Sequence, residues 1–105
     1  KVEALYESEP SLHNEIKILK ALQGNLGIPN IIKHGISMQD KCLYCATDLF
    51  GVSLEDLLNY CDGKFSIKTT FMIFYQLLER FRHIHISGYT HGDLRPDNIM
   101  IGLGN

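Results

Sequence analysis

The feature that most constrains this chain is the run His91-Gly92-Asp93-Leu94-Arg95-Pro96-Asp97-Asn98 near its C-terminal end. The run places an acid, a cation and an amide in one short loop. A long helical pattern precedes it, and the apolar, strand-like stretch Ile99-Met100-Ile101 follows it. Polar turns with glycine and proline are common between elements, and Asp93 or Asn98 alone would be interpreted in that way. The complete run in this context predicts a functional loop between a helix and a strand.

The spacing H-x-D-L-R-x-x-N resembles the catalytic loop of protein kinases, H-R-D-L-x-x-x-N. Phosphoryl transfer needs a positioned hydroxyl and a neutralised phosphate more than covalent chemistry by the protein. The resemblance implies that Asp93 orients the substrate hydroxyl and accepts its proton, and that Arg95 contacts the transferred phosphate. Asn98 would offer its carbonyl oxygen to Mg2+, which prefers hard oxygen ligands.

Length, composition and charge exclude several classes of protein. The chain has 105 residues, of which 45% are hydrophobic and 21% charged, as in a small soluble domain. A net charge of -2 argues against a nucleic-acid partner, and no apolar run approaches the roughly 18 residues of a membrane span. Three cysteines give no complete disulfide framework, and no signal-peptide pattern opens the chain. A reducing, intracellular setting, the cytoplasm or the nucleus, therefore fits best. We also expect a monomer.

Hydrophobic periodicity predicts the element order strand, helix, two strands, two helices, loop and strand. The expected elements are a strand over 1–5, a helix entered at 9–11 and stopped by Gly24, strands over 31–36 and 42–49, a helix from a capping box at 53–56 to about Tyr60, and a helix from a Ser66 cap to Gly88. This order is that of an α+β fold.

Glu15 lies on or beside the apolar stripe of the first predicted helix, because Ile18, Leu19 and Leu22 follow it at helical spacing. A carboxylate on an inward face is costly unless it is paired. Lys1, on the preceding strand, is a candidate partner. The alternative is that Glu15 reaches water at the edge of the stripe, as most glutamates do. The helical pattern does not decide between them, but the loop at Asp93 favours the pair, since kinases join a strand lysine to a helix glutamate.

Longer segments resemble the casein kinase 1 family of protein kinases. The segments that carry the resemblance are Gln23-Gly24-Asn25-Leu26-Gly27-Ile28-Pro29-Asn30, Asp48-Leu49-Phe50-Gly51-Val52-Ser53-Leu54-Glu55-Asp56-Leu57, Lys64-Phe65-Ser66-Ile67-Lys68-Thr69, the loop at Asp93, and Ile101-Gly102-Leu103-Gly104-Asn105. They occur in the family's order and cover essentially the whole chain. The resemblance implies a partial protein-kinase fold over 1–105, with part of the small lobe over 1–47, a hinge over 48–52 and the start of the helical lobe over 53–105.

The same resemblance implies the nucleotide site and the substrates. Lys1 would hold the phosphates of ATP with Glu15 behind it, Thr47 would be the gatekeeper, and the backbone of Asp48 and Phe50 would pair with the adenine edge. The implied cofactors are ATP and Mg2+. The implied partners are protein substrates with serine or threonine, acidic or already phosphorylated. Lys1 is not a start residue, so we expect a cut chain, without the glycine-rich loop and the D-F-G segment, that is inactive alone.

Two positions depart from the family pattern. Gly92 stands where the family usually has arginine, although the related vaccinia-related kinases also carry H-G-D. Arg95 stands where serine/threonine kinases usually have lysine, and a planar fork differs from a compact ammonium. These departures leave two alternatives open. One is a pseudokinase that binds nucleotide or partners without catalysis, and the other is a truncated product without a stable fold.

Overall fold

The computed structural model describes residues 1–7 and 11–103 of the chain. The predicted helix entry at Glu9 and Pro10 lies outside these residues, and so do Gly104 and Asn105 of the last family-like segment. The chain divides into two compact units, Lys1–Asp48 and Leu49–Asn105. Each unit is described by itself below.

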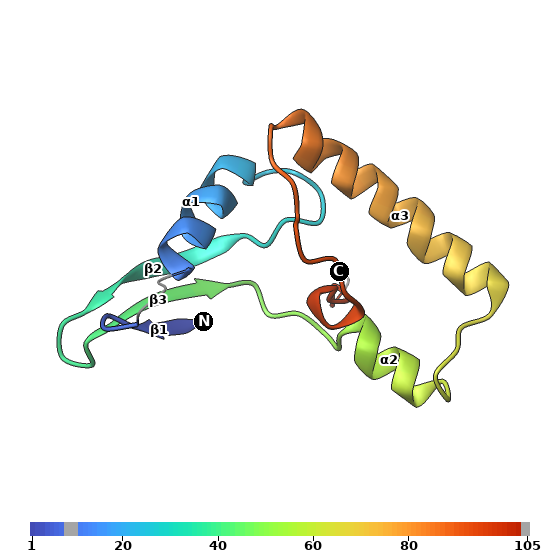
Figure 1. Ribbon diagram of the computed structural model, residues 1–105, viewed down its shortest axis with the longest axis horizontal. Coiled ribbons are helices and arrows are strands. Elements are labelled where there is room, and N and C mark those ends of the chain that lie inside the picture. The colour runs from blue at the N-terminus through green and yellow to red at the C-terminus, as the bar shows by residue number, and fades with distance from the viewer. Residues whose placement is uncertain (8–10, 104–105) are drawn as a thin grey trace. The chain divides into compact units, whose positions relative to one another are not determined.

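The first unit is a three-stranded antiparallel sheet with one helix packed on it (Figure 1). Its strands are β1 (Val2–Ala4), β2 (Ile31–Ser37) and β3 (Cys42–Thr47), in the spatial order β1-β3-β2, and its helix is α1 (Leu12–Leu22). Leu12 and Ile16 on one face of α1 pack with Cys45 of β3 in a buried cluster. Half-buried Ile31 and Leu43 border that cluster. The predicted strand–helix–strand–strand order is confirmed.

Strand β3 ends at Thr47, two residues before the predicted end at Leu49. Side-chain chemistry explains the earlier end. Asp48 Oδ2 accepts hydrogen bonds from the main-chain N–H of Asn30 (3.0 Å) and from its Nδ2 (2.7 Å). A carboxylate that binds the neighbouring backbone offers the chain an alternative to the ladder. The apolar pattern of Leu49 and Phe50 therefore overstated the strand.

The second unit contains two helices and an irregular C-terminal segment. Helix α2 (Leu54–Tyr60) begins at a capping box in which Ser53 Oγ accepts from the Asp56 N–H at 3.1 Å and Asp56 Oδ2 accepts from the Ser53 N–H at 3.1 Å. Helix α3 (Ile67–Ile86) begins at Ser66, whose hydroxyl accepts from the Thr69 N–H at 3.1 Å. The predicted cap residues of both helices are confirmed.

The predicted strand over 99–101 is only an isolated bridge between Ser53 and Met100. Three main-chain hydrogen bonds hold this segment: from Gly51 N–H to the Ile101 carbonyl (2.8 Å), from Ile101 N–H to the Val52 carbonyl (3.0 Å) and from Leu54 N–H to the Ile99 carbonyl (2.8 Å). The bridge ends where α2 begins, because a helix cannot continue the ladder. In the part of the chain that the structure describes, no helix has the length and apolarity needed to span a bilayer.

Candidate active site

Lys1 and Glu15 are brought together in the first unit. The Lys1 Nζ lies 2.5 Å from Glu15 Oε2. The backbone of Lys1 is fixed by β3, since its main-chain nitrogen donates to the Cys45 carbonyl (2.8 Å) and its carbonyl accepts from the Cys45 N–H (2.9 Å). The lysine side chain is 64% exposed and the glutamate 38%. The predicted pairing is therefore present at an accessible edge of the sheet, where the ammonium can reach a ligand. Its role toward a nucleotide stays a prediction.

Glu3 positions this pair, and the sequence analysis did not identify it. Its Oε2 accepts from the N–H groups of Leu12 (2.8 Å) and Ser11 (2.9 Å) and from the Ser11 hydroxyl (3.0 Å). The hydrogen bond from the Leu12 N–H is the main cause that lowers the pKa of Glu3 below its ordinary value. A carboxylate is favourable at a helix N-terminus because free N–H groups and the helix dipole meet there. Glu3 therefore ties the start of α1 to β1. Because Glu3 lies on β1 and caps α1 from a distance in sequence, no local sequence pattern marks it as a cap.

Thr47 and Asp48 close the first unit. Thr47 is half-buried at the end of β3, opposite Ile31, and its hydroxyl donates to the Asp48 carbonyl at 3.3 Å. The Asp48 N–H donates to the Asn30 carbonyl at 3.1 Å. The Asp48 side chain is thus structural, and the role of its backbone toward a nucleotide stays a prediction. Phe50, the next predicted nucleotide residue, is half-buried in the second unit.

The loop around Asp93 brings the predicted catalytic residues into contact in the second unit. Asn98 Nδ2 donates both to the Asp93 carbonyl (3.0 Å) and to Asp93 Oδ2 (2.9 Å). Arg95 Nε lies 3.1 Å from the other carboxylate oxygen, Asp93 Oδ1. A short 3-10 turn, η1 (Pro96–Asn98), makes this possible, because it folds Asn98 back over the start of the loop. One carboxylate therefore lies between a cation and an amide, and the roles of the three residues in catalysis stay predictions.

His91 anchors the same loop to α3. Its ring meets Phe81 edge to face, with ring centroids 5.7 Å apart. His91 Nδ1 accepts from the Asp93 N–H at 3.3 Å. Asp93 is thus attached to α3 through the His91 ring, by one hydrogen bond and one aromatic contact. Apolar residues recur at helical spacing along α3, at Ile73, Leu77, Phe81 and Ile84, and all four are half-buried, while no residue of α3 is fully buried.

The donor set of this loop fits a magnesium ion at Asn98. Because the Asn98 amide directs its NH2 group to Asp93, its carbonyl oxygen is the end directed away from that carboxylate. A single amide oxygen is a reasonable partial ligand for Mg2+, which keeps several waters. Among residues 1–7 and 11–103, no group of three or more His, Cys, Asp or Glu side chains is placed to hold a metal. A Mg2+ ion at this loop would therefore rely on Asn98 and on the phosphates that it would share.

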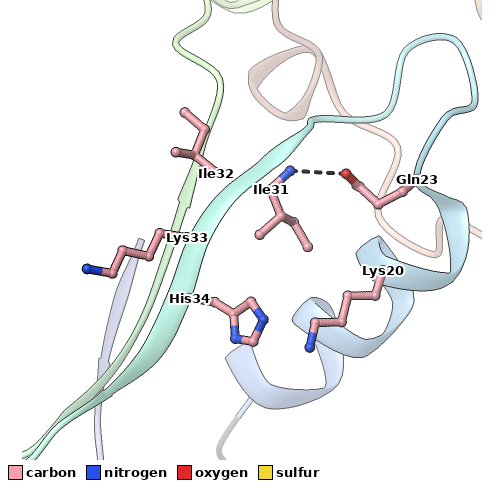
Figure 2. Close-up of a pocket in the computed structure, with 6 residues that line it drawn as sticks. All are labelled: Lys20, Gln23, Ile31, Ile32, Lys33 and His34. Carbon is pink, nitrogen blue, oxygen red and sulfur yellow. Dashed lines mark hydrogen bonds between the residues drawn. The ribbon is translucent and has the colours of Figure 1, made fainter.

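A surface hollow in the first unit lies away from these residues. Figure 2 shows it between α1 and β2, lined by Lys20, Gln23, Ile31, Ile32, Lys33 and His34, with a volume of about 450 Å3. Gln23 spans its upper end: Oε1 accepts from the Ile31 N–H (3.1 Å) and Nε2 donates to the Pro29 carbonyl (2.7 Å). None of the predicted site residues lines the hollow. The hollow is therefore a gap between α1 and β2, and the Gln23 side chain bridges this gap by its hydrogen bonds.

Asp97 also belongs to the loop, although the sequence analysis assigned it no role. Its Oδ2 lies 3.3 Å from Arg95 Nη2. An acid two residues after a cation could have suggested this pair, but the same acid is equally at home in a solvated turn.

Comparison with models of known protein families identifies the family of this chain. The model of the protein kinase domain matches residues 1–105, the whole of the chain. The match agrees with the α+β arrangement of a small antiparallel sheet and helices, and with the contacts of the loop at Asp93. The chain belongs to the protein kinase family.

Proposed function

We propose that this chain is part of an ATP-dependent serine/threonine protein kinase of the casein kinase 1 type. The observation that carries the proposal is the Asp93 carboxylate, which lies between Arg95 Nε and Asn98 Nδ2. This group can orient a hydroxyl, and the neighbouring cation and amide can meet phosphate and metal.

In the proposed reaction a substrate hydroxyl oxygen attacks the γ-phosphorus of ATP. The new oxygen–phosphorus bond forms as the bond between that phosphorus and the β,γ-bridging oxygen breaks, and ADP leaves with the bond's electrons. Asp93 accepts the hydroxyl proton, and Arg95 stabilises negative charge on the transferred group. A bound Mg2+ would supply further neutralisation of phosphate charge, and Asn98 would hold it.

Lys1 and Glu15 would bind the nucleotide from the first unit. The ion pair directs the ammonium of Lys1, a compact charge suited to phosphate. The Asp48 carbonyl and the Phe50 backbone would pair with adenine beside Thr47. The finer assignments rest on the family-like segments in the sequence: acceptors that are serine or threonine in acidic or already phosphorylated proteins, a monomer, and a cytoplasmic or nuclear location.

Phosphate transfer by the full-length protein that contains this chain tests the proposal. With ATP and Mg2+, an acidic peptide with serine or threonine should accept phosphate, and the same peptide with tyrosine should not. Asp93→Asn should lower kcat by about 10²-fold or more, because it removes the base. Asp62→Asn is the matched control, since Asp62 lies in the turn after α2 at a φ of 55° that asparagine also tolerates. It should leave kcat unchanged.

Equal activity of Asp93→Asn and the unmodified protein would refute the proposal. Nucleotide binding without transfer by the unmodified protein would instead favour the pseudokinase alternative. The transfer of phosphate to tyrosine alone would leave a kinase but exclude the serine/threonine type.

A further inference from the structure

We infer that Asp97 is a positioning residue for phosphoryl transfer, acting through Arg95. This inference rests on the proposed function and goes further, because it assigns a role to a carboxylate outside the predicted catalytic set. The structure places the Arg95 guanidinium between two carboxylates, with Nε 3.1 Å from Asp93 Oδ1 and Nη2 3.3 Å from Asp97 Oδ2.

The backbone explains how residues so close in sequence make this arrangement. Arg95 precedes η1 in an extended conformation, with φ of -135° and ψ of 155°. Pro96 then occupies the first turn, where its fixed φ suits a helical start. The turn brings Asp97 back toward the arginine side chain while Asn98 reaches Asp93. The same turn therefore positions Asn98 against Asp93 directly, and it positions Arg95 against Asp93 through Asp97.

The shape of the guanidinium suits this pair of ionic contacts. Its N–H groups lie in one plane in a fixed fork, so two carboxylates can be met at once. The ammonium of a lysine is a single charge at the end of a flexible stem. The arginine at position 95 therefore contacts the two acids through separate nitrogens, Nε to Asp93 and Nη2 to Asp97, which couples position 95 to position 97. Nη1 belongs to neither of these two ion pairs and is the nitrogen that would meet a phosphate oxygen.

The exposure of the three side chains sets the size of the expected effect. They are 59% (Arg95), 62% (Asp93) and 50% (Asp97) exposed, so water screens the pairs. Exposed ion pairs are weak, and we expect a tether that restricts where Arg95 lies. Loss of the Asp97 charge should lower kcat by about two- to fivefold, the rate equivalent of an exposed pair. KM for ATP should change less than kcat, since the tether acts on the transferred group.

A double-mutant cycle in the full-length protein tests the coupling. Asp97→Asn should lower kcat two- to fivefold when residue 95 is arginine and should have no further effect in Arg95→Lys, because the two contacts use two different nitrogens of the guanidinium and lysine has a single nitrogen. Asp62→Asn should leave kcat unchanged in both backgrounds. An equal effect of Asp97→Asn in both backgrounds, or no effect in either, would overturn the inference. So would a rise in KM for the peptide with kcat unchanged, which would make Asp97 a substrate-binding residue.

A second measurement separates this inference from the proposed function. Nitrogen-15 NMR of the Arg95 side chain, without nucleotide, reports how freely the guanidinium rotates. Asp97→Asn should speed that rotation, and Asp62→Asn should not. An unmodified protein that transfers no phosphate would overturn both the proposed function and the role of Asp97 in turnover, whereas unchanged rotation in an active Asp97→Asn variant would overturn the tether alone.

Discussion

At the scale of single residues, Gly92 shows how a local conformation accounts for a departure from a family pattern. Its φ is +78°, and a Cβ built on it would meet nothing within 4 Å. The left-handed region costs residues with a Cβ about 1 kcal/mol or more, and glycine avoids that cost. Glycine at this position therefore suits the turn before Asp93.

We predict that Gly92→Ala lowers the free energy of unfolding by about 1 kcal/mol through backbone strain, since there is space for the methyl group. Urea unfolding of the full-length protein measures the change. Gly102→Ala is the matched control, because Gly102 also has open space around it but lacks the positive φ. If the two substitutions have the same effect, strain at Gly92 is not the cause.

The residues that sequence reasoning found differ from those it missed in how their contacts are made. Asp93, Arg95 and Asn98 could be predicted together because one short loop contains them all. Lys1 and Glu15 could be paired because the loop at Asp93 pointed to a strand lysine joined to a helix glutamate, whereas the apolar stripe alone did not decide between a paired and a solvated Glu15. Glu3 was missed because it caps a helix from a strand, and Asp97 because its contact with Arg95 depends on a 3-10 turn that the sequence pattern does not reveal.

At the scale of elements, the two helix caps of the second unit differ in burial. Ser53 is only 8% exposed, while Ser66 is exposed. The Ser53 hydroxyl and N–H also reach Asp56 Oδ2, at 2.6 Å and 3.1 Å, so the box satisfies the groups in both directions. Ser66 instead shares its hydroxyl with the Thr69 N–H and the Thr69 hydroxyl. The stability of the chain should therefore be more sensitive to loss of the Ser53 cap of α2 than to loss of the Ser66 cap of α3.

We expect Ser53→Ala to cost about 1 to 2 kcal/mol of unfolding free energy, because it leaves a buried capping interaction unmade. Ser66→Ala should cost about 0.5 to 1 kcal/mol, since water can replace the exposed hydroxyl. Chemical denaturation of both variants, followed by circular dichroism, gives the comparison. A larger loss from Ser66→Ala would show that burial does not set the value of these caps.

At the scale of the whole chain, each unit relies on a different balance of forces. The first has a small buried cluster, with Leu12 only 2% exposed. In the second, α3 exposes several large apolar side chains, Phe71 and Tyr75 at 67% and 66% among them. Hydrophobic periodicity predicted α3, but the pattern cannot say how deeply its apolar side chains are covered. Polar caps therefore help to fix where the helices of both units begin. The sequence alone located only some of these caps.

Two carboxylates that cap helices, Glu3 at the start of α1 and Asp56 at the start of α2, also make the stability of the chain depend on pH. Hydrogen bonds from Leu12 and Ser11 lower the pKa of Glu3, and those from the Ser53 hydroxyl and N–H lower the pKa of Asp56. A carboxyl whose pKa is lower in the folded than in the unfolded chain stabilises the fold above its unfolded pKa. That stabilisation is lost as the pH falls through the lowered value. One such carboxyl lies in each unit.

We therefore predict that the melting temperature of the full-length protein is steady from pH 7 to 5 and falls below about pH 4, where carboxyls take up protons. Glu3→Gln and Asp56→Asn should each lower the melting temperature at pH 7, because an amide is a weaker acceptor for these N–H groups, and should make the profile from pH 5 to 3 flatter. Thermal melts followed by circular dichroism at each pH test this. A double variant whose melting temperature drops as steeply below pH 4 as that of the unmodified protein would assign the acid sensitivity to other carboxyls.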